Sequence, residues 1–87
     1  MIRKHIIAHG RVQGVGLRFT VTGFAKKYNV TGWVRNLYDG TVEMEVQGDE
    51  NSIQQMLVQI QKQRWIKVNH MEITEIPCVE ERGFRIR

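Results

Sequence analysis

The sequence predicts an α+β domain with two helices on one face of a β-sheet, and three observations lead to this prediction. Two stretches with helical spacing of apolar residues alternate with stretches of strand character. An Asp-Gly pair at residues 39–40 separates two of the strand stretches, as is typical of a β-hairpin. With 87 residues, the chain is long enough to bury a core without metal or disulfide support. We therefore expect a single domain over residues 1–87.

The first strand is expected over residues 3–12. Ile6 and Ala8 share one face of it, which should pack on the core, and Ile7 interrupts the alternation. His5 and His9 share the other face and could in principle bind a metal. No third ligand stands at a recognisable spacing, so we predict no metal site.

The first helix is expected over residues 18–28, because four apolar residues there have amphipathic spacing. These are Val21, Phe24, Ala25 and Tyr28. Gly23 lies inside this helix, where it costs about 1 kcal/mol relative to alanine unless another element packs closely against it. Asn29 is expected to end the helix.

The remaining elements follow in order: strands at residues 30–37 and 41–47, a helix at 50–64, and strands at 66–76 and 84–87. Asp49 is expected to cap the second helix and Trp65 to shield its end. Glu43 and Glu45 alternate with apolar residues in the 41–47 strand, which predicts a solvated acidic face.

The element order β-α-β-β-α-β matches a ferredoxin-like sandwich, with two helices on one face of a four- to five-stranded antiparallel sheet. In this fold the first two strands are parallel and the third lies between them. The fold alone does not define a function.

Residues 10–18, GRVQGVGLR, form the turn from the first strand into the first helix. Three glycines allow positive φ there, and successive amides at a helix N-terminus suit a phosphate-sized anion. Arg18 adds a charge that can bind two phosphate oxygens. The loop has neither Walker nor GxGxxG spacing. By itself it is also compatible with a plain connector followed by a surface arginine.

Composition restricts the function classes. The net charge of +4 favours anionic partners, but the basic residues are dispersed and fit small phosphorylated metabolites as well as nucleic acid. Cys78 is the single cysteine, so no intramolecular disulfide is possible. There is no signal-peptide pattern and no run of about 20 apolar residues, so we expect a cytoplasmic protein without a membrane segment.

A second informative stretch, GWVRNLYDG at residues 32–40, places Asn36 near the end of the second strand. On local sequence alone, Asn36 is a turn residue beside the hairpin. GRVQGVGLR followed by GWVRNLYDG nevertheless resembles the acylphosphatase family, and the similarity continues through Gly40, Val42 and Gly48 to the terminal GFRIR.

The resemblance implies hydrolysis of the carboxyl-phosphate bond of a small acyl phosphate, giving a carboxylate and inorganic phosphate without metal or other cofactor. It implies that Arg18 and the loop amides hold the phosphoryl group and that Asn36 orients the attacking water. The loop amides are those of Gln13, Gly14, Val15, Gly16 and Leu17. Leu17 replaces the family's usual aromatic residue, a change expected to affect loop packing more than chemistry.

The residue chemistry is consistent with this reaction. A carboxylate leaving group has a conjugate acid of pKa about 4, so it can depart without a general acid. Asn36 can hydrogen-bond a water but cannot remove its proton at neutral pH. The loop offers no Cys, Ser or Asp nucleophile, so a phosphoenzyme is not expected.

Two other classes of function remain open. A ferredoxin-like sheet can bind single-stranded RNA, but no RNP1-like string is present. A non-catalytic anion-binding module is the other alternative, and the presence of both Arg18 and Asn36 argues against it. We expect a monomer that binds no nucleic acid and no membrane. The motifs do not specify the acyl group.

Overall fold

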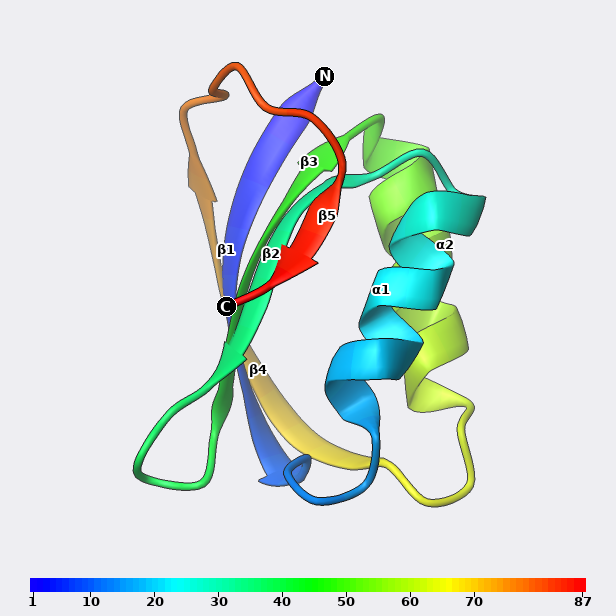
Figure 1. Cartoon of the computed structure of the whole chain (residues 1–87), viewed down its shortest axis with the longest axis vertical. Coiled ribbons are helices and arrows are strands. Elements are labelled where there is room, and N and C mark those ends of the chain that lie inside the picture. The colour runs from blue at the N-terminus through cyan, green and yellow to red at the C-terminus, as the bar shows by residue number, and fades with distance from the viewer.

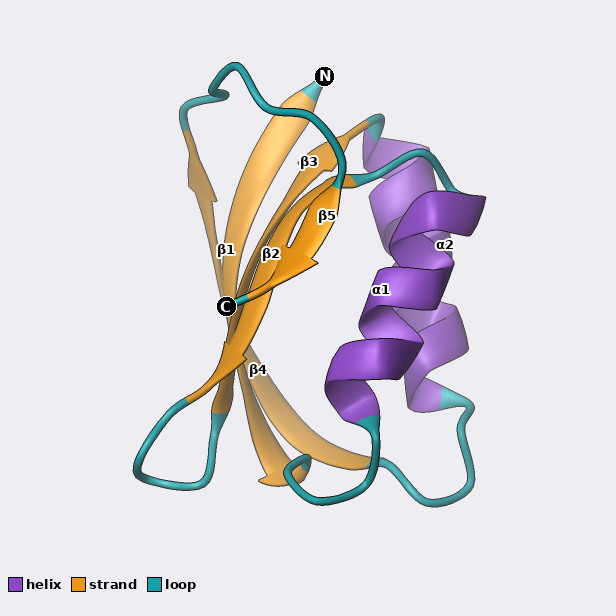
Figure 2. Ribbon diagram, in the orientation of Figure 1, coloured by secondary structure: helices purple, strands orange, loops and turns teal.

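The computed structural model describes residues 1–87, which form five strands and two helices (Figure 1). The elements are β1 (Ile2–Arg11), α1 (Leu17–Lys27), β2 (Thr31–Asn36), β3 (Val42–Gly48), α2 (Glu50–Gln61), β4 (Lys67–Ile76) and β5 (Phe84–Ile86). Both helices lie on the same face of one sheet and leave its other face without helices (Figure 2). No helix is long and apolar enough to cross a membrane.

The sheet has the strand order β4-β1-β3-β2-β5. Strand β3 is antiparallel to both β1 and β2, so β1 and β2 run parallel with β3 between them. This arrangement confirms the predicted ferredoxin-like fold. It also places the ends of β1 and β2 at the same end of the sheet, where the glycine loop and Asn36 lie.

Strand β5 is the one departure from an antiparallel sheet, because it pairs in parallel with β2, with Phe84 opposite Gly32. Strand β4 ends near the start of β1, and residues 77–83 then cross to the opposite edge of the sheet (Figure 1). The chain therefore reaches β2 at the end of the sheet where β2 begins. From there β5 can only run in the same direction as β2. The sheet is therefore mixed.

The core lies between the helices and the sheet and consists of apolar side chains at alternating strand positions and at helical spacing. Among its fully buried members are Ile6, Ala8, Val21, Ala25, Val34, Val42, Met44, Val46, Ile53, Met56 and Ile60. Both periodicities that predicted the elements therefore correspond to buried faces.

The end of α2 differs from the prediction. The helix stops at Gln61 and not at residue 64, and Trp65 is 56% exposed, so it does not shield the helix end. Ile66 is buried there instead, with 2% of its surface exposed. A turn bonded from the Ile66 amide to the Gln63 carbonyl brings this side chain into the core, and the helix has to end before it.

The ends of the helices show how their caps work. Asn29 has a left-handed φ of 59°, and the Val30 amide donates to the Ala25 carbonyl at 2.8 Å, which ends α1 in a Schellman turn. Asn29 thus ends the helix, as predicted. Asp49 occupies the N-cap position of α2, but its side chain makes no capping hydrogen bond.

The acidic side chains on the helix-free face of the sheet form ion pairs, whereas the sequence predicted that they are simply solvated. Glu45 accepts from Arg3 at 2.8 Å, and Glu43 accepts from His5 at 2.7 Å and from Arg35 at 2.6 Å. Arg3 is only 2% exposed. The segment that follows β4 covers it, because a residue of that segment, Glu81, accepts from Arg3 at 2.8 Å.

Candidate active site

The loop between β1 and α1 has a buried apolar residue at each end and exposed glycines between them. Val12 and Leu17 are buried in the core at its two ends. Between them, Gly14 and Gly16 are exposed and have φ values of 73° and 77°, a region that residues with a Cβ rarely occupy. Gly16 is also the N-cap residue of α1. The loop therefore turns sharply and leads directly into the helix.

The loop amides have no acceptor within the protein. None of the hydrogen bonds is donated by a backbone N–H between Gln13 and Phe19, and the first turn of α1 begins with the Thr20 amide bonded to the Gly16 carbonyl at 3.0 Å. Unpaired amides at a helix N-terminus carry partial positive charge. Such a loop suits a bound oxyanion.

Arg18 lies in the first turn of α1, next to these amides. It is partly exposed and forms no ion pair, whereas Arg3 and Arg35 are both bonded to carboxylates. Its guanidinium is therefore free to bind an external anion.

Asn36 is the last residue of β2 and pairs with Val42 of β3, which in turn pairs with Ala8 of β1. Strand alternation places it on the helix-covered face with Val42 and Ala8, while Arg35 lies on the opposite face with Glu43. Asn36 is exposed and makes no side-chain hydrogen bond. It thus stands at the end of the sheet where the loop crosses to α1.

Gln13 connects the two stretches directly. Its side-chain Nε2 donates to the carbonyl oxygen of Leu37 at 2.7 Å and to that of Thr41 at 2.8 Å. Leu37 follows Asn36, so the tether fixes the glycine loop against the end of β2. Sequence reasoning assigned only the Gln13 backbone to the site and missed this side-chain role, for which the local pattern holds no signal.

The hairpin between β2 and β3 is itself braced. The Asp39 carboxylate accepts from the Thr41 hydroxyl at 2.6 Å and from its amide at 3.0 Å, and these bonds lower the Asp39 pKa. The Leu37 amide donates to the Thr41 carbonyl at 2.9 Å. The two carbonyls that hold Gln13 therefore belong to a turn with its own internal hydrogen bonds.

The histidines lie on the other face of the sheet, and two of them are bonded to carboxylates. His5 bonds Glu43 and His9 bonds Glu72, and the ring of His9 lies 5.6 Å from that of His70. No three His, Cys, Asp or Glu side chains form a group that could hold a metal ion. The sequence-predicted site and the histidines are thus separate features of the molecule.

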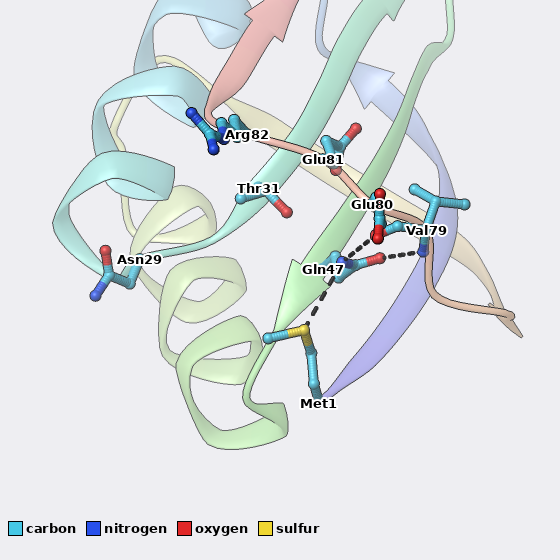
Figure 3. A pocket seen from close by; sticks show the side chains of 8 residues that line it. All are labelled: Met1, Asn29, Thr31, Gln47, Val79, Glu80, Glu81 and Arg82. Carbon is cyan, nitrogen blue, oxygen red and sulfur yellow. Dashed lines mark hydrogen bonds between the residues drawn. The ribbon is translucent and has the colours of Figure 1, made fainter.

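The largest hollow, about 650 Å³, lies at the other end of the sheet, near Met1 (Figure 3). Gln47 lines it, accepting from the Val79 amide at 2.9 Å and donating to the Val79 carbonyl at 2.8 Å. Cys78 lies at this end as well, because its sulfur is 3.7 Å from the Met1 carbonyl oxygen. Since the glycine loop follows the opposite end of β1, this hollow is separate from the loop.

The fold and the loop define a class of protein: a ferredoxin-like α+β domain with a glycine loop of unpaired amides at the end of β1. Comparison with known proteins makes this specific. The family model for acylphosphatase matches residues 4–86. The chain therefore belongs to the acylphosphatase family, whose members are hydrolases of acyl phosphates.

Individual relatives agree over the whole chain. The acylphosphatase of Geobacillus kaustophilus is 48% identical over 99% of this chain and 94% of its own length. The acylphosphatase of Bifidobacterium longum is 40% identical over 100% of this chain and 93% of its own length. The crystal structure of acylphosphatase from Bacillus subtilis superposes with a TM-score of 0.92 at 37% identity, covering 100% of this chain and 99% of the other.

Proposed function

We propose that the chain hydrolyses acyl phosphates by direct attack of water on phosphorus, with Arg18 and the loop amides holding the phosphoryl group and Asn36 orienting the water. One observation carries the proposal. The unpaired amides of residues 13–19 and the free side chain of Asn36 meet at one end of the sheet, where the Gln13 side chain ties their two loops together.

The first task of the site is to bind the phosphoryl oxygens. Phosphoryl transfer is largely a matter of positioning and of stabilising charge on the non-bridging oxygens. The amides from Gln13 to Leu17 supply neutral donors, and the Arg18 guanidinium supplies a permanent positive charge. The Leu17 side chain is buried, which leaves its amide as the part of this residue that reaches the site.

The second task is to place the water. The Asn36 side chain has both a donor and an acceptor, so it can fix the orientation of a water without taking its proton. As the oxygen–phosphorus bond forms, the bond from phosphorus to the acyl oxygen breaks, and the carboxylate leaves with the electron pair. It needs no proton from the enzyme, because its conjugate acid has a pKa of only about 4.

The proton of the attacking water passes, in this proposal, to a phosphate oxygen of the substrate. Neither a carboxylate nor a histidine belongs to the loop or to the end of β2. We therefore expect no limb in the pH–rate profile near the pKa of an enzyme histidine or carboxylate. Such a limb would contradict substrate-assisted proton transfer while leaving the phosphate site intact.

The direct test measures the rate of benzoyl phosphate hydrolysis at neutral pH in the presence of a chelator. We expect rapid hydrolysis that added divalent cations do not increase. Activity that disappears with the chelator and returns with a metal would contradict the metal-independent mechanism. Binding of inorganic phosphate without any turnover would indicate a non-catalytic anion-binding module instead.

We further propose that the single domain over residues 1–87 acts as a monomer in the cytoplasm, with acyl phosphates and not nucleic acid as its partners. The placement of Arg18, Asn36 and the loop amides on one chain supports the monomer, because no second subunit is needed to complete the site. Sedimentation at the concentration of the activity assay tests it, and activity that rises with self-association would contradict it.

A further inference from the structure

A groove runs along α1 from the turn that carries Arg18. It has a volume of about 300 Å³ and is lined by Phe19, Thr20, Gly23, Phe24, Lys27 and Gln63. Phe19 directly follows Arg18 and is 75% exposed, so the groove begins beside the proposed phosphate site. This volume is at the lower end of the range for small-molecule sites.

Gly23 opens this groove. Phe19, Gly23 and Lys27 are spaced four residues apart, so they line up on one face of the helix, about 6 Å apart along its axis. A Cβ added at Gly23 would have no atom of another element within 4 Å. The glycine is therefore not required for close packing. Because Gly23 has no side chain, it leaves a notch in the groove between the side chains of Phe19 and Lys27. Phe24 and Gln63 lie at the sides of this notch.

The position of the groove fits the geometry of the reaction. In phosphoryl transfer the attacking and leaving oxygens lie roughly in line with phosphorus. If Asn36 holds the water on the β2 side, the acyl group has to leave on the other side. Helix α1 packs against β2 and β5 on one side and against α2 on the other (Figure 1). Gln63 follows α2, so the groove lies on the side away from Asn36.

We infer that this groove holds the acyl group of the substrate, and that Phe19 and Gly23 select acyl phosphates with an aromatic or medium-length aliphatic acyl group over acetyl phosphate. The inference rests on the proposed function. Phe19 and Phe24 supply aromatic surface on which a flat or apolar acyl group can pack. Lys27 lines the far end of the groove, and its Nζ lies 5.5 Å from the centre of the Tyr28 ring.

The test compares benzoyl phosphate and acetyl phosphate in wild type, Gly23→Leu and Phe19→Ala. Leucine favours helix and has open space at position 23, so Gly23→Leu should fold while filling the notch. We expect its kcat/KM for benzoyl phosphate to fall about tenfold and that for acetyl phosphate to stay within about twofold. Phe19→Ala should show the same selective loss. Gln55→Leu adds the same side chain to an exposed position of α2 outside the groove and should change neither value.

Equal effects on both substrates, or no effect, would overturn the inference while leaving the proposed function standing. A selective loss of benzoyl phosphate turnover in Tyr38→Ala but not in Gly23→Leu would also overturn it, because the acyl group would then lie against the exposed hairpin. Hydrolysis of neither substrate by the wild-type chain would overturn the proposed function itself.

Discussion

The Gln13 side chain donates to the carbonyl oxygen of Leu37 across 2.7 Å, joining the glycine loop to the residue that follows Asn36. The second bond from the same nitrogen, to Thr41, makes the tether bidentate. Both acceptors are main-chain atoms of a turn braced by Asp39. One glutamine therefore ties the loop amides proposed to bind phosphate to the turn that follows Asn36, the residue proposed to orient the water.

Replacing Gln13 should impair turnover more than phosphate binding. Gln13→Ala removes the tether but keeps the loop amides, so we expect kcat to fall about 10- to 100-fold with the phosphate inhibition constant within about threefold. Gln13→Glu should be at least as harmful, because a carboxylate cannot donate to two carbonyls. Steady-state kinetics with phosphate as inhibitor checks this. Unchanged kcat in both variants would show that the tether has no role.

The buried ion pair between Arg3 and Glu81 should make stability depend on acid pH. Burial by itself would raise the Glu81 pKa, but the hydrogen bond and charge of Arg3 outweigh it and lower the pKa below 4.5. This contribution is present above the unfolded pKa and is lost as pH falls through the folded one. Glu81→Gln should lower the free energy of unfolding by about 1–3 kcal/mol at pH 7 and by less in acid.

Urea denaturation between pH 7 and pH 3 measures this dependence. Glu80→Gln is the matched control, because Glu80 is exposed and forms no ion pair. Equal pH dependence in both variants would contradict the assignment of the effect to the Arg3–Glu81 pair.

Gly16→Ala should lower both stability and phosphate affinity. Alanine at a φ of 77° costs about 1–2 kcal/mol, and relieving the strain would turn the loop amides away from the anion. Gly83→Ala is the control, because Gly83 has a similar φ of 72° but lies in the segment before β5. It should lose similar stability and keep phosphate affinity. Equal loss of affinity in both variants would contradict the loop assignment.

Gly23→Ala should raise the free energy of unfolding by about 1 kcal/mol, because alanine is the better helix former and no atom of another element lies within 4 Å of the new Cβ. For a domain of this size, that corresponds to an increase in Tm of about 4–8 °C. Thermal denaturation measures it. A lower Tm would mean that the glycine serves the packing of the helix after all.

Much of the fold followed from periodicity in the sequence. The alternation of Val42, Met44 and Val46 and the spacing of Val21 and Ala25 both correspond to buried faces. Ion pairs between residues far apart in the sequence could not be predicted in this way. Nothing local marks Arg3 as a buried residue, since its burial depends on Glu81, which lies 78 residues further along the chain. The end of α2 was also misplaced, because the choice between Trp65 and Ile66 as the buried residue depends on the path to β4.

The candidate site was predictable to a similar extent. The glycines and Arg18 stand together in sequence, and the loop they form is visible as a motif. Asn36 could be placed only through the topology, which sets β1 and β2 parallel and brings their ends to the same end of the sheet. The tether by the Gln13 side chain could not be predicted, because its acceptors are carbonyls of a distant hairpin.

The central claim is that Arg18 and Asn36 have different tasks. The most direct measurement is kcat for benzoyl phosphate together with the inhibition constant of inorganic phosphate in Arg18→Ala and Asn36→Ala, with Arg82→Ala at the far end of the molecule as a charge control (Figure 3). We predict that Arg18→Ala loses about tenfold or more in phosphate affinity and nearly all turnover. Asn36→Ala should keep its phosphate affinity and lose about 10²- to 10³-fold in kcat. Equal phosphate affinity in wild type and Arg18→Ala would contradict the account.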